Sequence, residues 1–292
     1  MKSAFLFFPK PVFWLLPAMI LSFWACKSKP AQKVHPMPSL IFNRVEAEDP
    51  AHLNLFFSLE MENPFPSDGA VTIGAWRVEI NGKMANSGFS LDNSETSAFR
   101  VRPGANSYPL KLNMDIDALA DIGLAPADNY EVNLIIKLNF LFDSAPLAEI
   151  EVSGLASFPG IQAPVFSINT IAILKAELVN TRFRVSMTID NPNPFPVGLA
   201  AFSYELYGNG RLWADGAEKN IIRVPGKSSV RGDLYLIMNF INMKRDLLDQ
   251  VINLIDVNYR FEGEAQVSTE VEYLPKFTTE FSLSGYSEVL EN

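Results

Sequence analysis

The chain repeats its own turn signals at a nearly constant spacing. Asn81-Gly82 recurs as Asn209-Gly210, at an offset of 128 residues. Four further matches follow the same order at offsets of 122 to 129: Glu62-Asn63-Pro64 with Asp190-Asn191-Pro192, Ser87-Gly88 with Asp215-Gly216, Pro103-Gly104 with Pro225-Gly226, and Asn129-Tyr130 with Asn258-Tyr259. Any β-protein scatters such dipeptides, but their shared order indicates two copies of one unit. A chain of 292 residues is long enough for two ordinary domains.

The segments between these turns alternate apolar and polar residues. In the first copy the apolar positions are Leu53, Leu55, Phe57, Leu59 and Met61. In the second copy they are Phe183, Val185, Met187 and Ile189. Later runs in each copy, around residues 132–140 and 257–261, alternate in the same way. Period-two alternation is typical of strands with one face buried in a core.

The dipeptides between the runs predict how these strands connect. Asn-Gly supplies the two positive-φ residues of a type I′ hairpin turn, and Pro-Gly is typical of a type II turn. Hairpins with one buried face form antiparallel sheets, and two stacked sheets form a sandwich. We therefore predict a mainly β protein with two tandem antiparallel β-sandwiches.

Each copy is also expected to contain one short helix. In the second copy Met243, Leu247 and Val251 lie on one helical face, with Leu254 nearby. In the first copy Asp115 is a candidate N-cap and Gly123 a candidate stop. Gly154 to Pro164 contains two glycines and two prolines and marks the predicted boundary, so the sandwiches are placed at 39–160 and 161–292.

The N-terminus has the pattern of an export signal. Residues 1–25 combine Lys2 and Lys10 with a short apolar run, and Ala25 directly precedes Cys26, the single cysteine. The apolar run is about 14 residues, too short for a comfortable transmembrane helix of roughly 20. We expect residues 1–25 to be a signal peptide and Cys26 to be acylated, as in a bacterial lipoprotein. An uncleaved anchor, or secretion with an incidental cysteine, is the alternative.

Residues 26–38 are polar and contain proline, which suits a flexible tether between the lipid on Cys26 and the first sandwich. The formal net charge of −9 and the lack of a basic cluster argue against nucleic acid as a partner. The expected partners are the membrane, through the lipid, and an unidentified envelope protein or lipid. The chain itself is expected to be a monomer in the periplasm or at the outer membrane.

The strands ending at Met61 and Ile189 run into proline-rich turns. The turns are Asn63, Pro64, Phe65 and Pro66 in the first copy, and Asn191, Pro192, Asn193, Pro194, Phe195 and Pro196 in the second. Each proline removes a ladder donor, and each asparagine can bind nearby backbone in an Asx-turn. We interpret the motif as structural, with the phenylalanines pinning the turn to the core. Asn-Pro-Phe is also a docking peptide in eukaryotic trafficking. We disfavour that role here, because the motif is embedded in a folded repeat of an expected bacterial lipoprotein.

The order of strand, acid-Asn-Pro, Asn-Gly hairpin, Pro-Gly turn, helix and Asn-Tyr strand resembles the type 2 late embryogenesis abundant (LEA) family, or water-stress and hypersensitive-response (WHy) domain. Residues 190–196 are similar to its Asn-Pro-Asn signature, and the first copy holds a reduced version. The resemblance covers roughly residues 39–288. The resemblance implies small sandwiches like those of immunoglobulin and fibronectin type III domains, each with one short helix. It also implies no catalytic residues, and roles in desiccation, stress protection or binding at membranes.

Residue patterns that carry chemistry are missing from the sequence. His35 and His52 lack a third metal-ligating partner, so neither a metal site nor a cofactor is expected. No cysteine–histidine or Gly-x-Ser-x-Gly arrangement and no glycine-rich phosphate loop occurs. Trp76 and Tyr204 match at offset 128 and are interpreted as core residues, although they could line an apolar cleft.

Three functions follow as hypotheses. The favoured hypothesis is a non-catalytic lipoprotein that binds or stabilises partners at the cell envelope in a stress or desiccation response. The second is a carrier or sensor of an apolar, lipid-like ligand, held in a pocket of about 300 Å³ or more between helix and sheet. The third, an enzyme, needs convergent titratable groups that the sequence does not offer.

Overall fold

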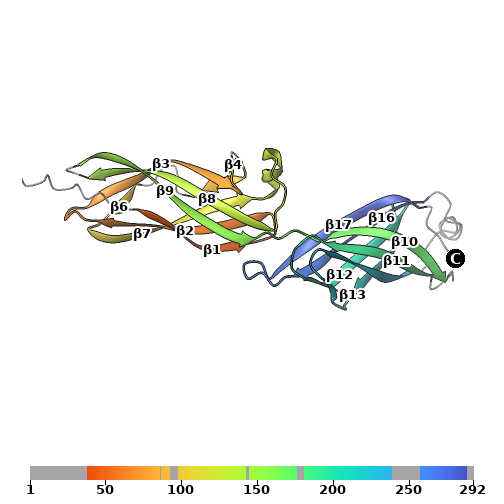
Figure 1. Cartoon of the computed structure of the whole chain (residues 1–292). Coiled ribbons are helices and arrows are strands. Elements are labelled where there is room, and N and C mark those ends of the chain that lie inside the picture. Colours follow the sequence, from red (N-terminus) through yellow and green to blue (C-terminus); the bar gives the residue numbers. More distant parts are fainter. Residues whose placement is uncertain are drawn as a thin grey trace, which may run out of the picture. The chain divides into compact units, whose positions relative to one another are not determined.

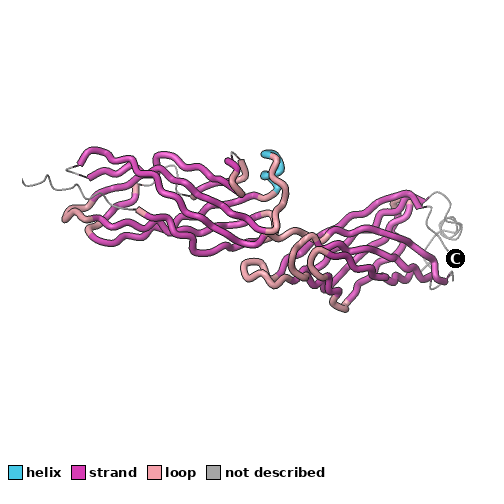
Figure 2. Tube along the Cα trace, in the orientation of Figure 1, coloured by secondary structure: helices cyan, strands magenta, loops and turns pink. Residues whose placement is uncertain are grey.

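The structure is a computed structural model. It describes residues 38–287, except residue 86 and residues 93–97, 143–144, 176–180 and 239–256. Within these described ranges nearly every segment is a strand (Figures 1 and 2). All strand pairs described there are antiparallel. The prediction of a mainly β, sandwich-like protein is confirmed.

The first sandwich has two sheets. One has the order β1-β2-β7-β5 and the other β4-β3-β8-β9, with β6 pairing to β3. The strands are β1 (Ser39–Ala47), β2 (His52–Asn63), β3 (Gly69–Ile80), β4 (Lys83–Ala85), β5 (Phe89–Leu91), β6 (Phe99–Val101), β7 (Gly104–Asp115), β8 (Asn129–Phe142) and β9 (Ala145–Pro159).

The second sandwich repeats this arrangement. A three-stranded sheet has the order β10-β11-β15, and a five-stranded sheet has the order β13-β12-β16-β17, with β14 pairing to β12. The strands are β10 (Val165–Lys175), β11 (Thr181–Asn191), β12 (Val197–Gly208), β13 (Arg211–Glu218), β14 (Ile222–Val224), β15 (Ser228–Met238), β16 (Val257–Ser268) and β17 (Lys276–Ser287). β10, β11 and β15 correspond in order to β1, β2 and β7.

Each sandwich encloses one hydrophobic core between its sheets. Phe57 of β2 and Ile136 of β8 belong to the first core, and Phe183 of β11 and Phe261 of β16 to the second. All the alternating apolar residues predicted in β2 and β11 are buried, with at most 3% of their surface exposed. Apolar burial of this kind is the main driving force for folding, and the period-two prediction of these faces is confirmed.

The Asn-Gly turns form the hairpins that the sequence predicts. Asn81 and Gly82 join β3 to β4 with φ values of 48° and 76°, and Asn209 and Gly210 join β12 to β13 with the same values. These positive φ values define the type I′ geometry that favours Asn-Gly.

The two Pro-Gly turns are not equivalent. Gly104 has a φ of 87°, as a type II turn requires, but after Pro225 the positive φ of 50° falls on Lys227. The type II prediction for the second turn is therefore wrong. Gly226 is needed for a different reason, because a Cβ there would lie 2.4 Å from the carbonyl oxygen of Pro194.

Two details of the predicted repeat also change. Gly88 follows β4 with a φ of 82°, whereas Gly216 lies inside the continuous strand β13, so these glycines do not correspond. The Asn81 side chain accepts a hydrogen bond from the backbone N–H of Glu131. The Asn209 side chain accepts one from the backbone N–H of Asn258. The matching offset here is 127 rather than 129. The offset predicted from sequence is therefore wrong by two residues. Because side chains alternate with period two along a strand, this shift still assigns each residue to the correct face of the sheet.

The predicted helices are not seen as α-helices in the described residues. In the first sandwich Asp117–Ile122 forms a 3₁₀ helix, and Gly123 ends it with a φ of 70°. The Asp115 carboxylate accepts the N–H groups of Asp117 and Ala118, at 3.0 and 3.3 Å. Six residues provide too little length for a stable α-helix, and 3₁₀ geometry is typical of short connectors. The helix expected over Met243 to Leu254 lies outside the described residues, as do Cys26 and the tether to residue 37.

Candidate functional site

The Asn-Pro turn of the second sandwich is held by a buried polar network. The side-chain oxygen of Asn191 accepts the backbone N–H of Asn193 at 3.0 Å, which closes an Asx-turn. Its amide nitrogen reaches the carbonyl oxygens of Phe195, Val224 and Pro225, at 2.8 to 3.2 Å. Asn191 therefore links the end of β11 to the end of β14, at a place where proline prevents ordinary strand pairing.

Asn193 carries this network into the segment before β10. Its side-chain oxygen accepts the N–H of Gln162, and its side-chain nitrogen donates to the carbonyl of Gln162, both at 2.8 Å. The nitrogen also donates to the side chain of Asn191 at 2.9 Å. Asn193 is fully buried. One side chain thus satisfies both backbone groups of Gln162, as a paired strand would.

The first sandwich has a smaller version of the same turn. The Asn63 side chain accepts the N–H of Phe65 at 2.9 Å and donates to the carbonyls of Ser67 and Val101. These bonds correspond to those of Asn191. Phe65 occupies the place of Asn193, so the link to the preceding segment is missing. The asparagine side chains of both turns point to backbone groups, an arrangement suited to architecture.

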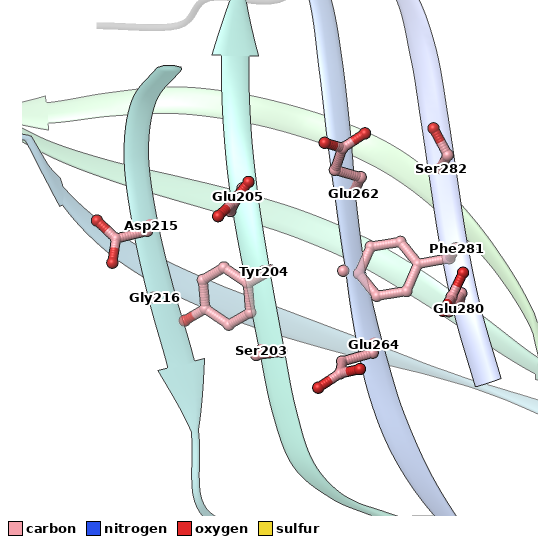
Figure 3. Close-up of a pocket in the computed structure, with 11 residues that line it drawn as sticks. Ser203, Tyr204, Glu205, Asp215, Gly216, Glu262, Glu264, Glu280, Phe281 and Ser282 are labelled. Atoms are coloured by element: carbon pink, nitrogen blue, oxygen red, sulfur yellow. The ribbon is translucent and has the colours of Figure 1, made fainter. Parts of the chain in front are cut away.

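A hollow lined by both polar and apolar atoms lies on the outer face of the five-stranded sheet of the second sandwich. It has a volume of about 640 Å³. Tyr204 and Phe281 lie in its centre but bury their side chains toward the core. The outward walls are formed by Glu205, Asp215, Glu262, Glu264 and Glu280, together with Ser203 and Ser282 (Figure 3). We call this hollow the acidic groove.

Strand register sets carboxylates of the acidic groove directly opposite one another. Glu205 faces both Asp215 of β13 and Glu262 of β16, and Glu264 faces Glu280 of β17. Like charges in directly opposite positions destabilise a sheet. The acidic groove therefore keeps a local repulsion that the fold itself does not need.

One end of the acidic groove is partly neutralised within the sandwich. Arg260 forms an ion pair with Glu262 at 3.1 Å, and its guanidinium lies 4.4 Å from the ring centre of Tyr207. The Tyr207 hydroxyl donates to Glu205, and this bond raises the pKa of the phenol. Among the described residues, no cation forms an ion pair with Asp215, Glu264 or Glu280.

The corresponding face of the first sandwich is balanced internally. Arg77 of β3 binds Glu151 of β9 through two hydrogen bonds of 2.8 and 3.0 Å, and Lys137 of β8 pairs with Glu149 at 3.1 Å. The Arg77 hydrogen bonds lower the pKa of Glu151. The positions of Arg77 and Lys137 correspond to those of Glu205 and Glu264. The two sandwiches thus share a register but carry different charge patterns.

Other residues singled out from the sequence do not contribute to the acidic walls of this groove. Tyr204 is buried in the core and donates to the carbonyl of Tyr235 at 3.3 Å, whereas Trp76 is half-buried against the first core. His52 is exposed and pairs with Asp49. The groove carboxylates were not predicted as a site, although Glu262 and Glu264 occupy outward strand positions in the sequence. Finding the groove requires the register of four strands.

Three further results concern only the part of the chain that the structure describes. Its His, Cys, Asp and Glu side chains form no group of three or more that could hold a metal ion. It contains no helix long and apolar enough to cross a membrane. The cleft proposed for an apolar ligand would include the helix at 243–254, which is outside that part, so this cleft stays a prediction.

The fold and the groove define a protein built from antiparallel β-sandwiches, with a polar surface site rather than an enclosed pocket. Residues 186–273 match the model of the family described as late embryogenesis abundant protein, LEA_2. The matched residues lie in the second sandwich, from β11 to the loop after β16. The second sandwich therefore contains a domain of the LEA type 2 family, a stress-related family that is in general not enzymatic.

Comparison with solved structures gives low similarity. A protein from Archaeoglobus fulgidus is 16% identical, with 43% of this chain and 97% of that chain covered and a TM-score of 0.26. The periplasmic chaperone SfaE is 12% identical, with 88% and 100% covered and a TM-score of 0.24. Red sea bream transglutaminase is 12% identical, with 87% and 31% covered and a TM-score of 0.22. The search of curated proteins finds no match.

Proposed function

We propose that this chain is a non-catalytic lipoprotein, anchored through acylated Cys26, whose two LEA type 2-like domains bind or stabilise partners at the cell envelope under stress. The observation that carries the proposal is the LEA type 2 match over residues 186–273. The N-terminal apolar run followed by Ala25 and Cys26 supports anchoring.

The composition of the acidic groove supports a binding role over catalysis. Ser203 and Ser282 line it, but both histidines of the chain, His35 and His52, precede the second sandwich in sequence. A serine nucleophile needs an adjacent general base to be activated. The groove is also an open surface, where water screens charges, whereas catalytic carboxylates usually work in a shielded site.

The anchor is tested by replacing the acylated atom. Cells grown with an alkyne fatty acid should label the wild-type chain, and Cys26→Ser should abolish the label. Ser28→Ala, two residues away, is the matched control and should label normally. Equal labelling of wild type and Cys26→Ser would refute the lipoprotein assignment without affecting the fold.

The protective role is tested in the native host after deletion of the gene. Survival of drying and rehydration should fall and should be restored by the wild-type chain. Cys26→Ser tests whether membrane attachment is needed, and Asn191→Ala tests whether the intact second domain is needed. Full survival of the deletion strain after drying, and also after osmotic and heat stress, would refute the stress role.

A further inference from the structure

The outer face of the three-stranded sheet has an unusual combination of side chains. Arg182 and Arg184 point outward from β11, alternating with buried core residues. On the neighbouring strand β15, Ile237 lies opposite Arg182 and Tyr235 lies opposite Arg184. Tyr235 is 59% exposed and Ile237 57% exposed. With Arg231 on the same side of β15, these five residues form what we call the basic face.

The arginines of the basic face lack ionic partners in the described part of the chain. No carboxylate there forms an ion pair with Arg182, Arg184 or Arg231. The Nε of Arg184 is buried without a hydrogen-bond acceptor, and an unmet buried donor costs free energy. Asp233 shares the face, and Asp190 is bonded to Ser229. The face keeps unpaired positive charge in a chain of net charge −9.

The two outer faces of the second sandwich therefore have opposite character. The acidic groove covers one sheet and the basic face covers the other. Side chains of the same strand face repeat about every 6.8 Å, so Arg182 and Arg184 have the same spacing as Glu262 and Glu264. Because the sheets are stacked back to back, one sandwich cannot bring its own two faces together.

We propose that the basic face of one chain docks on the acidic groove of a second copy. Arg182 and Arg184 would then neutralise the groove carboxylates that lack an internal partner, of which Glu264 is one. Tyr235 and Ile237 would lose their exposure to water. The contact uses different surfaces on the two chains, so it is head-to-tail and leaves a free face at each end. Chains therefore add into rows rather than closed dimers, in contrast to the monomer expected from sequence.

The strength of this contact follows from the kind of interaction. An exposed ion pair strengthens an association constant by roughly 1.4- to 5-fold and is screened over about 8 Å at physiological salt. A few such pairs give weak association in dilute solution, which strengthens as salt is removed. Confinement of the chains to one surface would raise their effective concentration. The proposal does not depend on the lipid anchor, because association is measured below without a membrane.

The first experiment is a charge exchange on the full chain, purified in a nonionic detergent. Sedimentation velocity at 20 mM and 300 mM salt should show association of the wild type that salt weakens. Arg184→Glu and Glu264→Lys should each reduce the association constant by roughly tenfold. The double variant should restore it, because the exchanged charges meet between copies. Arg102→Glu and Glu131→Lys, in the first sandwich, are the controls and should associate normally.

The second experiment traps the contact covalently. A chain carrying Tyr235→Cys and Ser282→Cys, together with Cys26→Ser to remove the native thiol, should form a ladder of disulfide-linked oligomers under mild oxidation. Each single variant in the same Cys26→Ser background should not form the ladder. If Arg184→Glu proves poorly folded, Arg231→Glu replaces it in the charge exchange. A monomer at every salt concentration, or failure of the double variant to recover, would overturn the proposal. The proposal would also be overturned if the chain is monomeric and binds phosphatidylglycerol vesicles in a manner that depends on Arg184. A lipid surface would then be the occupant of the basic face.

Discussion

Replacement of Asn191 by alanine is the sharpest test of how the second sandwich is held together. The side chain is 2% exposed, accepts from the backbone N–H of Asn193, and donates to carbonyls that include that of buried Val224. A hydrogen bond contributes about 1 kcal/mol, and a buried group left without a partner costs roughly 1–3 kcal/mol more. Asn191→Ala removes two donor N–H groups, which three carbonyl oxygens share, and an acceptor that binds both the backbone and the side chain of Asn193. The free energy of unfolding should therefore fall by about 3–5 kcal/mol.

The measurement is urea unfolding of the full chain, followed by the fluorescence of buried Trp213 after Trp14, Trp24 and Trp76 are replaced by phenylalanine. With a slope of about 1.5 kcal/mol per molar urea, the midpoint should fall by roughly 2–3 M. Asn169→Ala is the matched control, because this exposed asparagine on β10 bonds only to the side chain of Thr188. The control should change stability by less than about 0.5 kcal/mol. Equal effects of the two variants would refute the structural role assigned to Asn191.

Three other predictions can be checked with simple measurements. Ala201, exposed in β12 with a φ of 49°, should tolerate glycine with a gain of about 0.5–1 kcal/mol in the same urea assay, because glycine relieves the left-handed strain; a loss would contradict the strained backbone. Gly263→Ala should destabilise by roughly 2–3 kcal/mol, since its Cβ would lie 2.1 Å from the carbonyl oxygen of Ser203; unchanged stability would show that β12 and β16 can separate at no cost. The hydrogen bond to Asp49 raises the pKa of His52, so its stabilising effect is complete below about pH 6.5 and is lost as pH rises through the higher folded-state value. Proton NMR should show that shift in the wild type and its disappearance in Asp49→Asn.

Local sequence determines the strands and hairpins more strongly than the surface site. Alternation in β2 and β11 identifies the buried face directly, because successive side chains of a strand point alternately to the core and to solvent. Asn209-Gly210 predicts its turn because few dipeptides accept two positive φ values. These features depend on neighbours within a few residues. The cores of both sandwiches could therefore be predicted without any knowledge of how the sheets pair.

The features that sequence did not predict depend on contacts between distant strands. The positive φ of Lys227 follows from the close approach of Gly226 to Pro194, some 30 residues earlier. The two hydrogen bonds between the Asn193 side chain and the Gln162 backbone join the two ends of a long strand hairpin. Glu205 and Glu264 become groove residues only through the register of β12, β16 and β17, including the bulge after Ala200. An alternating pattern identifies such residues as outward but not as neighbours.

The contrast between Glu264 and Lys137 gives a test that separates folding from association. Lys137 lies opposite Glu151 in the first sandwich, whereas Glu264 lies opposite Glu280 at the corresponding place in the second. Glu264→Lys therefore replaces a like-charge pair by an opposite-charge pair and should stabilise the second sandwich by about 0.5 kcal/mol. The same substitution should weaken head-to-tail association, because it removes a carboxylate that faces the arginines. Local conflicts of charge are expected where a surface serves a partner. A Glu264→Lys variant that loses stability and association together would show that the carboxylate serves the fold, and the repulsion in the acidic groove would then need another explanation.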